Sequence, residues 1–152
     1  MGYLWVILLC FLTDRITKLL IAHKLNGEIA ILPFLNITKV YNKGFLFGLG
    51  STSDFFLKKI LYIFLPILLV IFFSFLLYRL KDRSQKYIVA LIIGGALGNL
   101  FDRIFYGKVL DFIDFHIGNW HYPAFNIADI CISLGIFLFF ISLIFPHLLT
   151  RN

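Results

Sequence analysis

Long apolar runs without charge are the feature that most restricts the fold of this chain. Residues 60–78 and 130–149 contain no charged side chain, and residues 87–101 form a third uncharged run. About 20 mostly apolar residues are enough for a helix to cross the hydrocarbon core of a bilayer. A fourth apolar run, interrupted by three charges, covers residues 3–22. We therefore expect four membrane helices, at about 3–22, 55–79, 86–106 and 129–149.

The composition excludes several other classes of protein. Apolar residues make up 61% of the chain and charged residues 14%, against about 45–50% and 25% in soluble domains. Such a chain is too hydrophobic to be disordered. Its two cysteines, Cys10 and Cys131, cannot supply a disulfide framework, and we expect no disulfide between them. The net charge of +6 leaves too few charges for a nucleic-acid surface. We expect one membrane domain, residues 1–152, with no nucleic-acid partner.

The distribution of lysine and arginine predicts the orientation of the helices. The short loop 79–86 is rich in these residues, which favours the cytoplasm. Both termini would then lie inside, and loops 23–54 and 107–128 outside. Loop 23–54 also contains lysines, but long loops cross a membrane despite their charge. The first apolar run lacks the basic start and the small-residue cleavage site of a signal peptide, so we interpret it as a span.

Polar side chains within the expected spans gather near one end of the bundle. A helix rises about 1.5 Å per residue, which places Asp14 and Lys18 roughly 16–22 Å along the first span. Asn99 and Asp102 lie roughly 18–22 Å along the third span, which runs in the same direction. Asp129 stands where the fourth span begins at that same level. Charges at such depth are costly and usually mark function.

Each of these residues also has a purely structural interpretation. Asp14 and Lys18 are four residues apart and could form an ion pair within the helix. Asp129 could be the N-cap of the last helix. Arg103 could anchor the third helix at the headgroups, and Asn99 could hydrogen-bond to a neighbouring helix. Three glycines of the third span could be close-packing positions: Gly94, Gly95 and Gly98.

Carboxylates outside the spans suggest a chemistry. Asp111 and Asp114 follow the third span, and Asp129 begins the fourth. Two carboxyl groups in one site share a proton, so one can activate water while the other polarises a peptide carbonyl. Such hydrolysis needs no metal. A metal site including His116 and His121 is an alternative, but the recognised ligand spacings are absent, and no serine stands in a G-x-S-x-G setting.

Two other functions remain open at this point. A small four-helix proton-coupled transporter would also use carboxylates inside the membrane. Its substrate carboxylate would be expected nearer the bilayer midplane, and it would not need two large outer loops. A structural assembly subunit would use the charges only as pairs between helices. That function would leave the gathering of polar residues at one level unexplained.

Five short motifs occur in order along the chain. Residues 14–18 read D-R-I-T-K, 42–48 read N-K-G-F-L-F-G, 94–103 read G-G-A-L-G-N-L-F-D-R, 109–112 read V-L-D-F, and 125–129 read F-N-I-A-D. In these motifs, which cover nearly the whole chain, the sequence resembles lipoprotein signal peptidase, or signal peptidase II. This family consists of bacterial membrane aspartic peptidases.

The resemblance implies a function and a set of site residues. The family removes the signal peptide from diacylglyceryl-modified prolipoproteins, cutting before the lipidated cysteine at the outer face of the bacterial cytoplasmic membrane. Asp111 and Asp129 match its catalytic aspartates. Its supporting residues match Asp14, Lys18, Asn42, Gly44, Asn99, Asp102, Arg103 and Asn126. We expect a monomer without cofactor, whose partners are the lipid-modified prolipoprotein and membrane lipids.

The family resemblance also implies the fold class. We expect an all-α membrane protein with four transmembrane helices and a small β-structured extracytoplasmic element. Residues 29–40 are rich in β-branched and aromatic types around Pro33, as short strands require. Glycines in the same loop would let it close as a lid: Gly44, Gly48 and Gly50.

Two positions depart from the family pattern. Phe45 and Leu46 stand where small residues are usual, and their bulk could narrow the substrate groove. Arg15 stands beside Asp14, where a neutral polar residue is common. Arg15 could therefore compete with Lys18 as the partner of Asp14.

Overall fold

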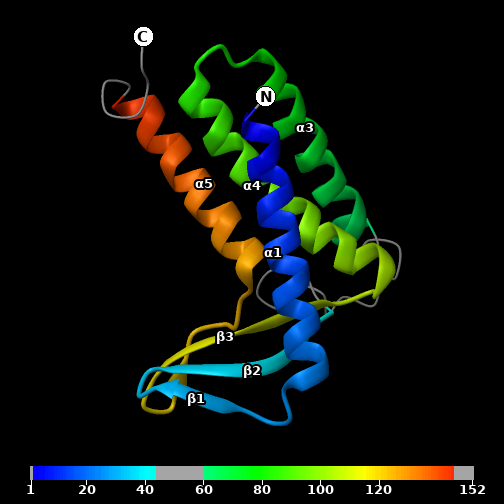
Figure 1. Cartoon of the computed structure of the whole chain (residues 1–152), viewed down its shortest axis with the longest axis vertical. Coiled ribbons are helices and arrows are strands. Elements are labelled where there is room, and N and C mark those ends of the chain that lie inside the picture. The colour runs from blue at the N-terminus through cyan, green and yellow to red at the C-terminus, as the bar shows by residue number, and fades with distance from the viewer. Residues whose placement is uncertain (1, 44–59, 146–152) are drawn as a thin grey trace.

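The computed structural model describes residues 2–43 and 60–145. Within these ranges, four helices lie side by side, and a small antiparallel sheet lies across one end of them (Figure 1). The helices are α1 (Gly2–Lys24), α3 (Leu65–Arg79), α4 (Arg83–Phe105) and α5 (Ile127–Ile144). A turn of π-helix, η2 (Ile60–Phe64), leads directly into α3. The fold is therefore mostly helical with a small sheet, as expected.

Three of the described helices are long and apolar enough to cross a membrane. These segments are Tyr62–Arg79, Arg83–Phe105 and Ile127–Ile144. Helix α1 has the required length, but Asp14, Arg15 and Lys18 give it too many charges for the same criterion. The described residues thus support three of the four expected spans by composition. The beginning of the expected span 55–79 lies outside the described residues, as does the end of the span 129–149.

Glycines bring the other helices close to α4. A Cβ atom on Gly95 would lie 2.4 Å from the carbonyl oxygen of Ala128 on α5, and one on Gly98 would lie 2.6 Å from Asp14 Oδ2 on α1. Gly94 faces α1 in the same way. Because real Cβ atoms do not approach other atoms so closely, only glycine permits these helix separations. The close-packing interpretation of these glycines is confirmed.

The helix faces that point away from α4 are apolar. Trp5 on α1 is 72% exposed, Phe75 on α3 is 61% exposed, and Phe137 on α5 is 61% exposed. Many leucine, isoleucine and phenylalanine side chains of these helices are exposed beside them. Exposed apolar surface on this scale marks a face that meets a partner or a membrane.

The sheet has the order β1-β2-β3-β4, and all its neighbouring strands are antiparallel. Its strands are β1 (Ile29–Leu32), β2 (Leu35–Asn42), β3 (Val109–Ile117) and β4 (Trp120–His121). The strands expected in residues 29–40 are therefore present. The other two strands come from the second outer loop, which was not predicted to contribute to the sheet. Gly118, with φ of 59°, supplies the left-handed residue of the turn between β3 and β4.

The sheet lies where α1 and α4 end and where α5 begins (Figure 1). The connection between α3 and α4 lies at the opposite end of the bundle (Figure 1). Strand β3 follows α4 directly, and a short segment after β4 leads into α5. This topology places the polar side chains of α1 and α4, such as Lys18 and Asn99, next to the first residues of β3. The candidate site forms at this junction.

Candidate active site

Asp111 is the third residue of β3 and is only 4% exposed. Its Oδ1 accepts a hydrogen bond from Asn126 Nδ2 at 2.6 Å, and its Oδ2 accepts one from Asn42 Nδ2 at 3.3 Å. Burial, and then the neighbouring charge of Asp129, raises the pKa of Asp111 from 3.8 to about 6. The carboxyl group of Asp111 therefore holds its proton at a pH where an exposed aspartate has lost it.

Asp129 lies at the third position of α5, and Asn126 is the N-cap. The side chain of Asn126 accepts a hydrogen bond from Asp129 N at 3.0 Å, while Asp129 Oδ2 accepts one from Asn126 N at 3.1 Å. These reciprocal bonds form a capping box. The N-cap interpretation of Asp129 is therefore wrong. One oxygen of Asp129 closes the helix start, and the other remains for a different partner.

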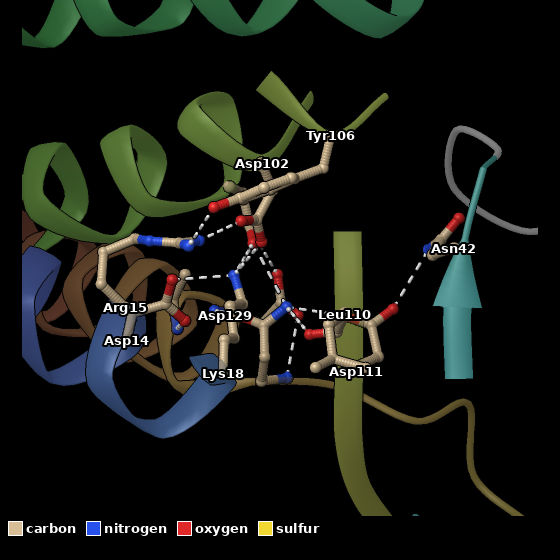
Figure 2. A network of polar contacts seen from close by, with 12 residues as sticks. Asp14, Arg15, Lys18, Asn42, Asp102, Tyr106, Leu110, Asp111 and Asp129 are labelled. Atoms are coloured by element: carbon tan, nitrogen blue, oxygen red, sulfur yellow. Dashed lines mark hydrogen bonds and ion pairs between the residues drawn. The ribbon is translucent and has the colours of Figure 1, made fainter. Parts of the chain in front are cut away.

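Asn99 on α4 supplies that partner. Its Nδ2 donates to Asp129 Oδ1 at 2.7 Å, and its Oδ1 accepts from Lys18 Nζ at 2.9 Å. Asn126 Nδ2 also approaches Asn99 Oδ1, at 3.2 Å. The two asparagines thus link Lys18 on α1 to Asp111 on β3 and Asp129 on α5. Figure 2 shows Asp111, Asp129 and Lys18 gathered around this network.

Next to this network, four charged side chains of α1 and α4 form ion pairs within α1 and between the two helices. Lys18 Nζ lies 2.8 Å from Asp14 Oδ2 and 2.8 Å from Asp102 Oδ2. Arg15 pairs with Asp102, and Asp14 Oδ1 accepts from Ala128 N at 3.0 Å. The ion-pair interpretation of Asp14 and Lys18 is confirmed. The expectation that Arg15 competes for Asp14 is wrong, because its guanidinium points to Asp102 (Figure 2).

Two predicted site residues do not join this network. The guanidinium of Arg103 lies over the ring of Tyr62, 5.2 Å from its centroid. Gly44 lies outside the described residues, as do the bulky pair at positions 45 and 46 and the other loop glycines at 48 and 50. The roles expected for Arg103 and Gly44, and the expected lid, stay predictions.

Asp114 belongs to a different cluster, on the sheet. Its carboxylate lies 2.9 Å from His121 Nδ1 and 3.5 Å from Asn36 Nδ2, and the rings of His116 and His121 stack with centroids 5.1 Å apart. Asp114 is three residues from Asp111, and alternate strand residues face opposite sides of a sheet. No group of three or more histidine, cysteine or acidic side chains suited to a metal occurs among residues 2–43 and 60–145.

Sequence reasoning missed two contacts of this region. Tyr106 Oη accepts a hydrogen bond from Arg15 Nη2 at 3.4 Å, and the carbonyl oxygen of Leu110 lies 3.4 Å from Asn126 Nδ2. Tyr106 stands four residues after Asp102, and residues at this spacing share a helix face. That spacing could have revealed the tyrosine. The Leu110 carbonyl depends on the strand conformation, and no side-chain pattern indicates it.

The arrangement suits hydrolysis of a peptide bond by two carboxyl groups that share one proton. Two carboxyl groups, Asp111 and Asp129, lie on either side of one asparagine, and each accepts hydrogen bonds from neutral N–H donors. Burial, and then the charge of Asp129, raises the pKa of Asp111. A protonated acid beside an ionised carboxylate can protonate a carbonyl oxygen while the ionised group takes a proton from water.

Comparison with known proteins gives consistent similarities along the whole chain. Residues 6–145 match the family described as Signal peptidase (SPase) II. The chain is 43% identical over 138 residues to the lipoprotein signal peptidase of Blochmanniella pennsylvanica, covering 88% of this chain and 83% of that protein. It is 42% identical over 151 residues to the lipoprotein signal peptidase of Aquifex aeolicus, covering 99% and 90%.

The fold is also similar to solved structures. One bacterial membrane enzyme, determined by the in meso method, superposes with a TM-score of 0.78 at 30% identity, covering 95% of this chain and 93% of that chain. A second bacterial membrane enzyme gives a TM-score of 0.79 at 29% identity, covering 94% and 87%.

Proposed function

The chain belongs to the signal peptidase II family, and on this premise we propose that it is an aspartic peptidase with Asp111 and Asp129 as its catalytic pair. Its reaction is the removal of the signal peptide from diacylglyceryl-modified prolipoproteins, with the cut before the lipidated cysteine. Family membership leaves the transporter hypothesis without support. In this proposal residues 1–152 act as a single peptidase domain, and the protein is a monomer.

The observation that carries this proposal is the shared environment of the two aspartates. Asp111 has a pKa raised to about 6 by burial and by the charge of Asp129. Asp129 accepts hydrogen bonds from Asn99 Nδ2 and Asn126 N, at 2.7 and 3.1 Å. The proposal therefore assigns the proton of the pair to Asp111 and the role of proton acceptor to Asp129. This is the asymmetry that aspartic hydrolysis requires.

The reaction follows from this asymmetry. Asp129 takes a proton from water, and the water oxygen bonds to the carbonyl carbon of the scissile peptide. Asp111 gives its proton to the carbonyl oxygen, which forms a neutral gem-diol. The C–N bond then breaks as Asp129 gives its proton to the leaving amine, and a gem-diol hydroxyl returns a proton to Asp111. Both carboxyl groups end in their starting states.

The other members of the network act as positioning residues. Asn126 bonds to both aspartates, and Asn99 holds Asp129 against Lys18. Asn42 bonds to the outer oxygen of Asp111 from strand β2. These contacts fix the two carboxyl groups relative to each other before substrate binds, which lowers the entropy lost on reaching the transition state.

The proposed topology has four membrane spans, with α1 as the fourth. Its three charges face α4 rather than lipid, since the side chains of Asp14, Arg15 and Lys18 are 0%, 11% and 3% exposed. Intramembrane charges usually face the bundle interior and pair with one another. The site and the sheet then lie at the extracytoplasmic face of the bacterial cytoplasmic membrane, and the basic loop between α3 and α4 lies inside.

A cleavage assay tests the proposed chemistry. The purified, detergent-solubilised chain would be incubated with a synthetic diacylated prolipoprotein peptide in the presence of a chelator. We expect cleavage before the lipidated cysteine, and its loss in Asp111→Asn and in Asp129→Asn at unchanged protein level. The Asp114→Asn variant removes a carboxylate from the same strand outside the site and should cleave normally. Cleavage that the chelator abolishes would overturn the aspartic mechanism.

A labelling experiment tests the orientation. Single cysteines in residues 25–35 and in residues 80–82 would be treated in intact cells with a membrane-impermeant thiol reagent. We expect the first set to be labelled and the second to be protected. Labelling of residues 80–82 would overturn the proposed orientation.

A further inference from the structure

A cavity of about 200 Å³ lies at the junction of α1, the end of α4 and the sheet. It lies beside the catalytic network but is not the site of the aspartates. Lys18 and Asp102 separate the cavity from Asn99 and Asp129. Arg15, Tyr106 and Leu110, which also line it, are labelled in Figure 2.

The cavity has an apolar lining with a cationic rim. Leu19 and Ala22 of α1, together with Leu110 of β3, form apolar wall. Lys108 stands at the rim, with Nζ 3.7 Å from the centroid of the Tyr41 ring. An apolar wall beneath a positive rim fits a ligand with a hydrocarbon part and an anionic head.

Cationic side chains outnumber acidic ones in the lining of the cavity. Asp102 is the acidic residue of the lining, and both Lys18 and Arg15 pair with it. Lys108 adds a cation, and Lys39 stands nearby, with Nζ bonded to the carbonyl oxygen of Ala22 at 2.8 Å. An anion entering the cavity would therefore meet lysine ammonium groups and a carboxylate that is already neutralised.

The lining of the cavity includes residue types that are enriched at the membrane–water interface. Its lining includes Leu19 and Ala22 near the end of α1 and Leu110 of β3, and the end of α1 lies beside the sheet (Figure 1). Tyr41 and Tyr106 stand in its lining, 44% and 54% exposed, and tyrosine is enriched at membrane–water interfaces. The exposed apolar side chains of Ile16 and Leu20 on α1 lie on the same helix, where lipid chains would run.

We propose that this cavity binds the phosphate headgroup of an anionic phospholipid from the outer leaflet, with Lys108 and Arg15 as its cationic contacts. The headgroup occupies the rim, and the glycerol and upper acyl carbons contact Leu19 and Ala22. Arg15 carries more N–H donors than its bonds to Asp102 and Tyr106 use. This site rests on the proposed orientation but not on peptidase activity, because it needs neither aspartate.

The test measures lipid binding by the full chain. The wild-type chain would be reconstituted in nanodiscs of phosphatidylcholine alone or of phosphatidylcholine with phosphatidylglycerol. The lipid molecules that stay bound when the chain is released from the nanodisc would be counted by native mass spectrometry. We expect preferential retention of one phosphatidylglycerol. The Lys108→Gln variant should lower this retention about fivefold, since a basic residue near a membrane surface contributes about 1 kcal/mol. Asp111→Asn should retain lipid like wild type, which separates this proposal from the peptidase.

Matched variants distinguish the cavity from general surface charge. Lys24→Gln removes an exposed cation at the end of the same helix, outside the cavity lining, and should leave retention unchanged. Ala22→Phe fills the cavity without changing charge and should lower retention as Lys108→Gln does. Equal retention by Lys108→Gln and wild type, or an equal loss in Lys24→Gln, would overturn the proposal. Displacement of the lipid by millimolar inorganic phosphate would also overturn it, because the apolar wall would then contribute nothing.

Discussion

Two groups of carboxylates lie side by side at the helix–sheet junction and are held in opposite ways. Asp14 and Asp102, which we call the ion-paired group, face cations of α1. Asp111 and Asp129, the amide-held pair, accept hydrogen bonds from asparagine side chains and from backbone N–H. The raised pKa of Asp111 comes from burial and then from the charge of Asp129, and the bonds from Asn42 and Asn126 oppose it. The comparison shows that burial beside a second carboxylate, in place of a cation, is what lets Asp111 hold a proton.

Asn99 marks the boundary between the two groups. Its Oδ1 accepts from Lys18, and its Nδ2 donates to Asp129. An amide can accept a hydrogen bond through its oxygen and donate one through its nitrogen. Asn99 therefore connects Lys18 to Asp129 by hydrogen bonds without direct contact between the ammonium and the carboxylate. Lys18 thus helps to orient Asp129 through its hydrogen bond to Asn99. Four experiments follow from this comparison.

The largest expected effect comes from removing proton exchange within the amide-held pair. Asp111→Asn should lower kcat about 10²–10⁴-fold, the range that general acid–base catalysis contributes. The asparagine still accepts the bond from Asn126, so the fold should persist. Cleavage of the diacylated peptide, measured with a thermal unfolding curve in detergent, checks both statements. A variant that cleaves at the wild-type rate would place the acid elsewhere.

The second effect concerns the ion-paired group. Lys18→Met keeps the length of the side chain but leaves Asp14 and Asp102 with less compensation, and breaking a buried pair costs about 3–5 kcal/mol. We expect a large fall in unfolding temperature. The double variant with Asp14→Asn should recover part of the loss, since Arg15 still pairs with Asp102. Equal stability of single and double variants would mean that packing, and not charge, holds the helices.

The third effect is a pH dependence of stability. In the folded chain the pKa of Asp111 rises from 3.8 to about 6, so the folded form binds this proton more tightly than the unfolded form does. The contribution of Asp111 to the free energy of unfolding is then fully present below pH 4 and is lost as the pH rises through about 6. The loss should be about 1–3 kcal/mol.

Thermal unfolding of wild type between pH 4 and 8 measures this slope. Asp111→Asn should abolish the part of this slope that comes from the Asp111 proton. The variant should be more stable than wild type at pH 7, although its cleavage activity is lost. A variant with the wild-type slope would assign the titration to another group.

The smallest effect separates the two roles of Asn126. Asn126→Ala removes the N-cap of α5, at about 0.5–2 kcal/mol, together with the amide donor to Asp111. Asn126→Asp keeps the cap, because aspartate caps helices as well as asparagine does. It also places a new carboxylate beside Asp111, which should raise the pKa of Asp111 further and move the pH optimum of cleavage upward. An unshifted optimum would show that the donor does not act on Asp111.

The helices could be predicted from the sequence because the bilayer imposes their length. Apolar runs near 60–78, 87–101 and 130–149 need no partner to be recognised. In helix α1 the pair of Asp14 and Lys18 could be predicted from its spacing, but the partner of Arg15 could not. That Arg15 pairs with Asp102 depends on how α1 rotates against α4, and no local pattern encodes that rotation.

The sheet was only half predictable. The β-branched residues of β1 and β2 are adjacent in sequence and joined by a turn at Pro33, so their pattern is local. Strand β3 pairs with β2 through contacts such as Asn36 with Asp114, which join segments far apart in the chain. Such pairing depends on the helices that bring the segments together. The capping role of Asn126 was missed for a related reason, since the exact first residue of α5 decides which side chain caps it.

The glycines of the helix bundle have a consequence for how this sequence can change over generations. Any side chain added to α4 at position 95 or 98 would collide with Ala128 or Asp14. Every nonsynonymous single-base change of a glycine codon gives either a residue with a Cβ atom or a stop. Neutral drift at these codons is therefore confined to synonymous bases. In a mutagenised population selected for cleavage, their protein sequence should stay constant while the exposed apolar face of α3 diversifies.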